Sequence, residues 1–245
     1  MPRQHTTQKQ SIRAQRAQKK RQQRKIIIGT MIGAGVLLVF LLLLPVILEA
    51  TRPVGEIVVP ELKEHQAVDF NTMGDPNAPV KMVIFSDFQC PFCKVFADDT
   101  EQAIIEQYVN TGKLFMVYVP YGPGGNYIGP ESLAAANAAF CAADQGKFWE
   151  FKQFIFANHT GQNVGDYTNK RLTAFAENLG LDMDQFKSCF KSNKFEEKLN
   201  EGIAEGRALG AGGTPAFIFN DGAATLTGAL PFENFASQIE ALLGQ

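Results

Sequence analysis

Apolar residues follow two patterns along the chain: one long uninterrupted run near the amino terminus, and shorter, interrupted runs after it. The long run covers residues 26–48 and contains no charged side chain. An α-helix rises 1.5 Å per residue, so a helix of this length spans about 34 Å, whereas the hydrocarbon core of a bilayer is about 30 Å thick. The pattern therefore predicts one transmembrane helix over residues 26–48.

Charge predicts how this helix is oriented. Residues 1–25 hold nine of the 23 basic residues and none of the 25 acidic ones. Basic flanks favour the cytoplasmic side, so we expect a solvated cytoplasmic tail and an extracytoplasmic chain after Glu49. A cleaved signal peptide is the alternative, but its apolar segment is usually 7–15 residues long, and no small-x-small site follows Leu48. Gly29 and Gly33 have the spacing at which two anchors would pack together.

The rest of the chain alternates between strand and helix patterns. Residues 49–75 are punctuated by proline and glycine, so we expect a linker in which the β-branched run 57–59 would make one short edge strand. From residue 76 to 245 the periodicities are those of an α/β domain. Apolar runs predict strands at 81–85, 114–119, 216–219 and 224–227, and helical spacing predicts helices from Cys93 to about 110 and at 131–144, 147–158, 169–179, 184–191, 194–209 and 232–243.

The order of these elements defines a topology. The first two strands flank a helix, which favours a parallel pair. Several helices follow with no strand pattern between them, which predicts a helical insert at about 122–193. Asn220-Asp221-Gly222 predicts a hairpin turn between the last two strands. The net charge of this body is acidic, which argues against a nucleic-acid-binding domain.

The chemistry of the chain is concentrated in Cys90-Pro91-Phe92-Cys93, directly before a predicted helix. Amide groups and the dipole at a helix start stabilise a thiolate, which lowers the pKa of the first cysteine. Pro91 suits the first helical turn, where its missing N–H has no partner to lose. Half of a zinc site is the alternative, but no second CxxC or paired histidines supply further ligands, so we expect no metal. A purely structural disulfide is less favoured, because so small an exposed loop is easily reduced.

Motif order makes the sequence resemble a known family. Ser86 to Cys93 follows a strand, a helical insert with Gly146–Phe151 comes next, and Gly213-Thr214-Pro215 precedes another strand. Over residues 74–245 this resembles the DsbA-like branch of the thioredoxin superfamily, in particular its membrane-anchored or secreted bacterial thiol:disulfide oxidoreductases. The resemblance implies a thioredoxin fold with an inserted helical subdomain, preceded here by the transmembrane helix.

The same resemblance implies residue roles. Cys90 would be the exposed nucleophile and Cys93 the buried resolving thiol, with Pro91 and Phe92 between them in the active-site loop. Thr214-Pro215 matches the family's cis-proline loop, which would place the Thr214 backbone beside Cys90 to pair with a substrate strand. No cofactor is implied.

Two positions depart from the family pattern. Many thioredoxin-like proteins have a buried acidic residue six positions before the first cysteine, where this chain has Ile84. Asp87 is closer to the cysteines, but its role stays open at this point. Strongly oxidising members often have histidine where this chain has Phe92, so one source of thiolate stabilisation is missing. We expect a Cys90 pKa below that of free cysteine and a less extreme oxidant.

Cys141 and Cys189 lie in two predicted insert helices. Several members of the family have a disulfide between insert helices, which a Cys141–Cys189 bond would match. Closing a loop of about 50 residues contributes roughly 3–4 kcal/mol in the chain-entropy model. The alternative is two buried free cysteines that pack as small apolar groups.

Several functions fit these features. The leading hypothesis is a single-pass cell-membrane enzyme that exchanges the Cys90–Cys93 disulfide with cysteine pairs of exported proteins. As an oxidase it would be reoxidised by a quinone-linked membrane partner; as a reductase it would receive electrons from a membrane carrier. An isomerase is less favoured, because residues 49–74 are too few for a dimerisation domain. A peptide-binding, chaperone-like module with incidental redox activity is the alternative from another class, and metal handling is a weaker one. Loss of activity on replacing Cys90 with serine separates an oxidoreductase from a chaperone.

Overall fold

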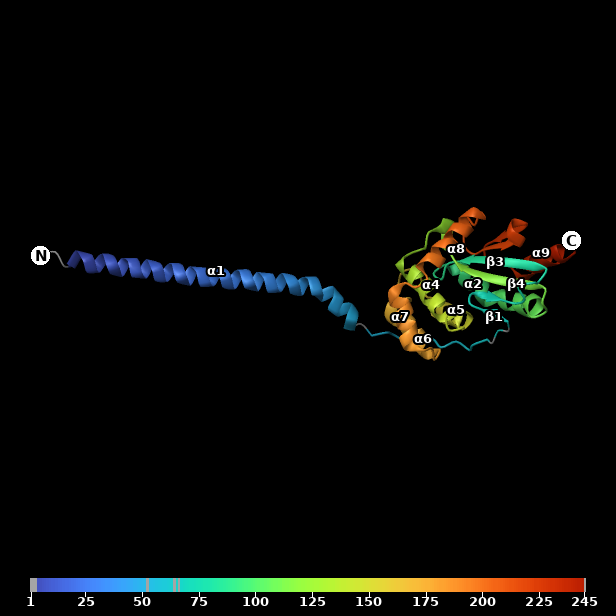
Figure 1. Ribbon diagram of the computed structural model, residues 1–245, viewed down its shortest axis with the longest axis horizontal. Helices are drawn as coiled ribbons and strands as arrows, with labels where there is room; N and C mark the ends of the chain where they lie inside the picture. Colours follow the sequence, from blue (N-terminus) through green and yellow to red (C-terminus); the bar gives the residue numbers. More distant parts are fainter. Residues whose placement is uncertain (1–3, 52, 64, 66, 245) are drawn as a thin grey trace. The chain divides into compact units, whose positions relative to one another are not determined.

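The computed structural model describes residues 4–51, 53–63, 65 and 67–244, and the chain divides into two units, Met1–Pro53 and Val54–Gln245. The first unit is a helix, α1 (Gln4–Thr51), drawn in blue in Figure 1. Within it, Ile27–Pro45 has a mean hydropathy of 2.7 and buries none of its residues, so by length and composition it can cross a bilayer. This agrees with the predicted span.

The helix also extends over the described part of the predicted tail, which we expected to be merely solvated. Glutamine, lysine, arginine and alanine dominate that stretch, and all four have high helix propensity. Growing an existing helix is much easier than nucleating a new one, so the apolar helix propagates into the polar segment. Pro45 lies inside α1 and removes one backbone hydrogen bond.

The second unit is built on a mixed sheet whose strands, within the described residues, have the order β1-β2-β4-β3-β5-β6. β3 and β4 are parallel, as predicted, and the other neighbours are antiparallel. The hairpin between β5 and β6 turns at Asn220–Gly222 (η3), also as predicted. The strands are β1 (Val68–Asp69), β2 (Thr72–Met73), β3 (Val80–Ser86), β4 (Leu114–Pro120), β5 (Ala216–Phe219) and β6 (Ala224–Thr227).

Helices cover the sheet and form the insert. The β3–β4 connection holds α2 (Pro91–Asp99), α3 (Glu101–Ile104) and a π-helical turn, η1 (Ile105–Val109). After β4 and a short turn, η2 (Pro123–Gly125), come the insert helices α4 (Pro130–Ala143), α5 (Phe148–Ala157), α6 (Asn169–Asn178) and α7 (Met183–Ser192). They group together beside the sheet in Figure 1. α8 (Glu196–Ala208) leads to β5, and α9 (Phe232–Leu243) ends the fold.

Alternation along β3 explains the two layers of core. Successive side chains of a strand point to opposite faces. Met82 and Ile84 belong to the main core, together with residues of α2, α9 and the insert, whereas Val83 and Phe85 belong to a smaller core beneath α8. Because both faces of β3 are covered, its sequence is a continuous apolar run. The active-site loop therefore begins at the end of a strand that is covered on both faces.

The segment predicted as a linker is partly structured. β1 and β2 extend the sheet before residue 76, the predicted start of the domain, and Asn71 is joined to Tyr118 through Tyr118 N–H and Asn71 O at 2.9 Å. Strands of two residues carry no periodicity, so sequence could not predict them. The run 57–59, expected as an edge strand, forms none, because its backbone pairs with side chains instead of another strand.

Residues 54–63, which we call the strap, lie along the insert. The Asn158 amide donates to Val58 O at 2.8 Å and accepts from Val58 N at 2.9 Å, which imitates a strand pairing. The Arg171 guanidinium donates to the carbonyl oxygens of Val54 and Glu56, both at 2.9 Å. The strap is therefore a docked part of the second unit.

Candidate active site at the start of helix α2

Cys90 occupies the N-cap position of α2, directly after the turn that follows β3. Its backbone is extended, with φ −76° and ψ 120°, and Pro91 takes the first helical position as the sequence predicted. The Cys90 carbonyl accepts from Cys93 N at 3.0 Å and Lys94 N at 3.2 Å, which closes the first helical turn. This turn brings the two cysteines together and leaves helix-start N–H groups facing the Cys90 sulfur.

The loop between α8 and β5 meets this turn. The Thr214-Pro215 peptide bond is cis, and Cys90 Sγ lies 3.3 Å from Thr214 O. Residues far apart in sequence thus form one site: Cys90, Cys93, Thr214 and Pro215. The Thr214 hydroxyl oxygen is also buried at this site.

Exposure differs from the expectation at Cys90. We expected an exposed nucleophile, but Cys90 is only 5% exposed and Cys93 1%, because Cys90 packs into the main core while the Thr214 loop lies against its sulfur. Phe92, by contrast, is 62% exposed. An incoming sulfur therefore has a narrow approach to Cys90 next to an exposed aromatic ring.

The electrostatics of the two thiols are opposed. The pKa of Cys90 is lowered to about 6, chiefly by a hydrogen bond from the Cys93 side chain, with help from the Thr214 hydroxyl and from the N–H groups of Cys93 and Phe92. Partial burial works against this lowering. The pKa of Cys93 is raised well above 9, first by burial and then by the neighbouring Cys90. One sulfur is thus a thiolate at neutral pH and the other a thiol, as the sequence predicted for the first.

Asp87 does not point at the cysteines. Its carboxylate accepts from Gln89 N at 2.8 Å, Ser132 Oγ at 2.6 Å and Ile128 N at 3.1 Å, so it ties the active-site loop to the start of α4. Burial raises the pKa of Asp87, partly offset by these bonds. Asp87 therefore holds the active-site loop against the first insert helix.

A hydroxyl pair lies on the other side of Cys93. Tyr118 Oη donates to Ser86 Oγ at 2.8 Å, and the Ser86 side chain hydrogen-bonds Cys93 in a way that favours its thiolate. Both residues are buried. Sequence reasoning assigned neither residue a role, because Tyr118 lies inside an apolar strand pattern and Ser86 was noted only as the first residue of the motif that ends at Cys93.

A buried ion pair was missed as well. Lys152 Nζ of α5 pairs with Glu101 Oε2 of α3, and their side chains are only 3% and 8% exposed. Lys152 also lies 5.4 Å from the centroid of the Tyr118 ring and 5.3 Å from that of Trp149. The sequence offered one signal, a lysine within the aromatic-rich stretch 148–157.

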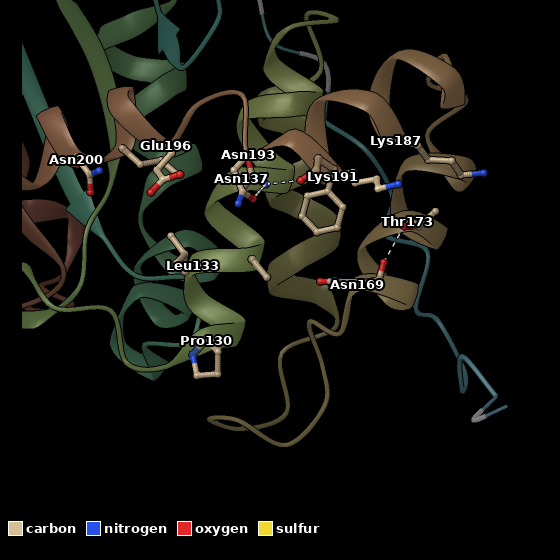
Figure 2. A pocket seen from close by; sticks show the side chains of 13 residues that line it. Pro130, Leu133, Asn137, Asn169, Thr173, Lys187, Lys191, Asn193, Glu196 and Asn200 are labelled. Carbon is tan, nitrogen blue, oxygen red and sulfur yellow. Dashed lines mark hydrogen bonds between the residues drawn. The ribbon is translucent and has the colours of Figure 1, made fainter. Parts of the chain in front are cut away.

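Cys141 of α4 and Cys189 of α7 are joined, with S–S 2.00 Å and Cα–Cα 5.8 Å. A pocket of about 770 Å³ lies between α4, α6, α7 and α8 (Figure 2). Asn137 spans one side of it, donating to Phe190 O and Asn193 Oδ1, both at 3.0 Å. None of the predicted site residues lines this pocket, so it is separate from the cysteine pair. Among the described residues, no group of three or more His, Cys, Asp or Glu is arranged to hold a metal.

A strand–helix–strand unit with two cysteines at the helix start, faced by a cis-proline loop, defines a thioredoxin-like redox protein. Residues 67–241 match the protein family described as Thioredoxin, and the chain belongs to that family.

Comparison with individual proteins shows which members of the family the chain resembles. The chain is 28% identical over 153 residues to the "Probable disulfide bond formation protein D" of Bacillus cereus, covering 61% of this chain and 69% of the relative. Among solved structures it resembles BdbD from Bacillus subtilis, with TM-score 0.64 and 22% identity over 71% of this chain and 93% of that one. It also resembles alpha-DsbA2 of Wolbachia pipientis, with TM-score 0.57 and 27% identity over 70% and 86%. The chain is a DsbA-like thiol:disulfide oxidoreductase, which confirms the predicted fold and enzyme class.

Proposed function

We propose that this protein is a membrane-anchored oxidase that donates the Cys90–Cys93 disulfide to cysteine pairs of exported proteins on the extracytoplasmic side. The observation that carries the proposal is the asymmetry of the two thiols: Cys90 has a pKa of about 6 and contacts Thr214 O, while burial holds the pKa of Cys93 well above 9. A stabilised Cys90 thiolate favours the reduced enzyme and so makes its disulfide a better oxidant.

The exchange proceeds in two steps. A substrate thiolate attacks Cys90 Sγ, the Cys90–Cys93 bond breaks, and Cys93 leaves with the electron pair and gains a proton. The second thiolate of the substrate then attacks the substrate sulfur that is bonded to Cys90. A substrate disulfide forms, and Cys90 leaves as a stable thiolate. Two electrons pass from the substrate to the enzyme. The low pKa of Cys90 makes it the better leaving group in the second step.

Exposure and topology support the choice of substrate. Phe92 is 62% exposed beside the cysteine, and unfolded chains present apolar side chains that would cover it. The Thr214 backbone next to Cys90 suits a substrate in extended conformation. The apolar span in α1 and its basic flank support a single-pass anchor with a cytoplasmic amino terminus. The reduced enzyme would be reoxidised by a membrane partner, such as a quinone-linked oxidase.

The direct test is oxidation of a reduced two-cysteine peptide by the full-length protein in detergent. We expect the wild-type protein to form the peptide disulfide with matching loss of its own, and Cys90→Ser to lose the activity completely. A protein with both Cys141 and Cys189 changed to serine is the matched control, because it makes the same chemical change at the other pair and should keep exchanging. If Cys90→Ser still prevents aggregation of an unfolded protein as the wild type does, the peptide-binding alternative replaces the oxidase.

A further inference from the structure

Gln89 lies between the first active-site cysteine and the helical insert. It directly precedes Cys90 in the chain, and it is fully buried. Its Nε2 donates to Ser132 Oγ at 2.8 Å and to Asn163 Oδ1 at 3.3 Å, and its Oε1 accepts from Asn163 N at 2.5 Å. Ser132 belongs to α4, and Asn163 to the loop between α5 and α6. One side chain therefore joins the neighbour of Cys90 to two separate parts of the insert.

The insert also holds the main chain at this point. Phe88 O accepts from Tyr167 Oη at 3.1 Å. Gln89 O lies 3.0 Å from His159 Nε2, and because a carbonyl oxygen can only accept, this ring nitrogen is the donor. Two consecutive peptide carbonyls before Cys90 are thus bound by side chains that follow α5 in the chain.

The remaining main-chain groups around Gln89 are bound within the active-site turn. Gln89 N donates to Asp87 Oδ1 at 2.8 Å, and Cys90 N donates to Asp87 O at 3.0 Å. Cys90 O accepts from the N–H groups of Cys93 and Lys94 in the first turn of α2. Every main-chain polar group from Phe88 O to Cys90 O therefore has a partner, which leaves the Cys90 backbone little freedom to move.

The loop that carries Asn163 has a defined shape of its own. Asn163 is in the left-handed region, with φ 54°, which asparagine adopts more readily than most residues. Gly129 leaves the room for it, because a Cβ at residue 129 would collide with the Asn163 side chain. The buried Asp166 carboxylate accepts from Thr160 N at 2.5 Å and from Gly161 N at 3.2 Å. This loop is therefore suited to hold Gln89 in one place.

The position of the Cys90 main chain matters for the chemistry of its sulfur. Hydrogen bonds from the Cys93 side chain, from Thr214 and from the N–H groups of Cys93 and Phe92 stabilise the Cys90 thiolate. Hydrogen bonds weaken steeply when their distance and angle change, and reacting groups must be held to within about 0.5 Å by the residues that support them. A small shift of Cys90 would therefore weaken several of these bonds together.

We propose that Gln89 positions Cys90 for exchange by fixing it to the insert, so that the helical insert sets the reactivity of the nucleophile. The proposal rests on the proposed function, because it concerns the same cysteine pair. Gln89 is buried and acts through the main chain of Cys90, so it is a positioning residue and does not touch substrate.

A buried carboxamide can also serve stability alone, and the insert contains one for comparison. Asn137 of α4 is buried and donates to Phe190 O and Asn193 Oδ1, both at 3.0 Å. It lies at the pocket that is separate from the cysteine pair. Asn137→Leu is therefore a matched control, which removes a buried carboxamide of the insert without changing the surroundings of Cys90.

The test measures the alkylation rate of the reduced full-length protein by iodoacetamide in detergent, from pH 4.5 to 9. Gln89→Met keeps the length of the side chain and removes the carboxamide. We expect its midpoint to move upward, so that the rate at pH 5 falls about tenfold while the rate at pH 9 stays within about twofold of wild type. Asn137→Leu should keep the wild-type midpoint, even where it lowers the free energy of unfolding as much.

A second pair of variants keeps the proposal testable if Gln89→Met fails to fold. His159 is half-buried, so a change there is easier to accommodate. His159→Leu removes the donor to Gln89 O, whereas His159→Gln keeps an N–H group for it. Both remove the imidazole and its charge, and both keep the other titratable groups of this turn, Asp87 and Cys93. We expect the rate at pH 5 to fall about threefold or more in His159→Leu and to be restored in His159→Gln.

The outcomes separate the two proposals. If the wild-type protein fails to oxidise the two-cysteine peptide, the proposed function is overturned. If it oxidises the peptide, but Gln89→Met and His159→Leu both keep the wild-type pH profile, only the positioning role is overturned. A shift in Asn137→Leu as large as that in Gln89→Met would also overturn the positioning role, because the shift would then follow from general loosening of the insert.

Discussion

The pH at which the Cys90 thiol ionises directly tests how strongly its surroundings stabilise the thiolate. With a pKa of about 6, about nine-tenths of Cys90 is thiolate at pH 7, whereas a cysteine at the ordinary value of 9.0 is about 1% ionised. The alkylation rate of the reduced protein with iodoacetamide should therefore rise about tenfold from pH 5 to pH 7 and level off above pH 7. Cys93 adds nothing in this range, because burial raises its pKa well above 9.

Lowering this pKa also changes the redox balance. Compared with a cysteine of ordinary pKa, the lowered Cys90 pKa stabilises the reduced form at pH 7 by at most about 1.4 kcal/mol, or about 30 mV in the two-electron couple. Water that reaches the sulfur screens the charge and reduces this value. The assay is a stopped-flow alkylation series from pH 4.5 to 9, with absorbance at 240 nm as a second reading of the thiolate. Cys90→Ser should abolish both signals below pH 8. A wild-type midpoint above pH 8 would refute the roles assigned to the Cys93 side chain, to Thr214 and to the N–H groups of the helix start.

Further predictions follow from the same structure. The reduction potential should fall by about 59 mV per pH unit below pH 6 and by about 30 mV per unit above it, because only Cys93 then takes up a proton; one slope from pH 5 to 8 would contradict this. Phe92→His should lower the Cys90 pKa and raise the potential, measured by glutathione titration. Replacing Cys141 and Cys189 together by alanine should reduce the free energy of unfolding by about 4 kcal/mol in urea, since the bond spans 48 residues. The full-length chain should stay in the membrane fraction after alkaline carbonate, and a chain lacking residues 1–51 should not.

Periodicity was sufficient to predict most of the fold. The strand at β3 and its parallel partner β4 are long apolar runs with clear turn signals, and the insert helices have strong spacing between glycine-rich loops. β1 and β2 were not predicted, because two-residue strands have no hydrophobic pattern and depend on pairing with β4. The helix over the polar tail was not predicted, because it forms as an extension of the neighbouring apolar helix and the local sequence pattern does not show this.

The site was predictable where chemistry is local and not where it depends on tertiary contact. Cys90, Pro91 and Cys93 lie within four consecutive residues, and this spacing directly predicts a redox-active cysteine pair. The direction of the Asp87 carboxylate was not predictable, because its partner Ser132 lies 45 residues away. Pairing of Glu101 with Lys152 likewise depends on how α3 and α5 pack.

The measurement that tests the central claim most directly is the reduction potential of the Cys90–Cys93 pair in the full-length protein, equilibrated with glutathione at pH 7. The account predicts a value of roughly −120 to −180 mV, within the range of disulfide donors. A value of about −270 mV would place the protein with thioredoxin-type reductants and would contradict the proposed oxidase function.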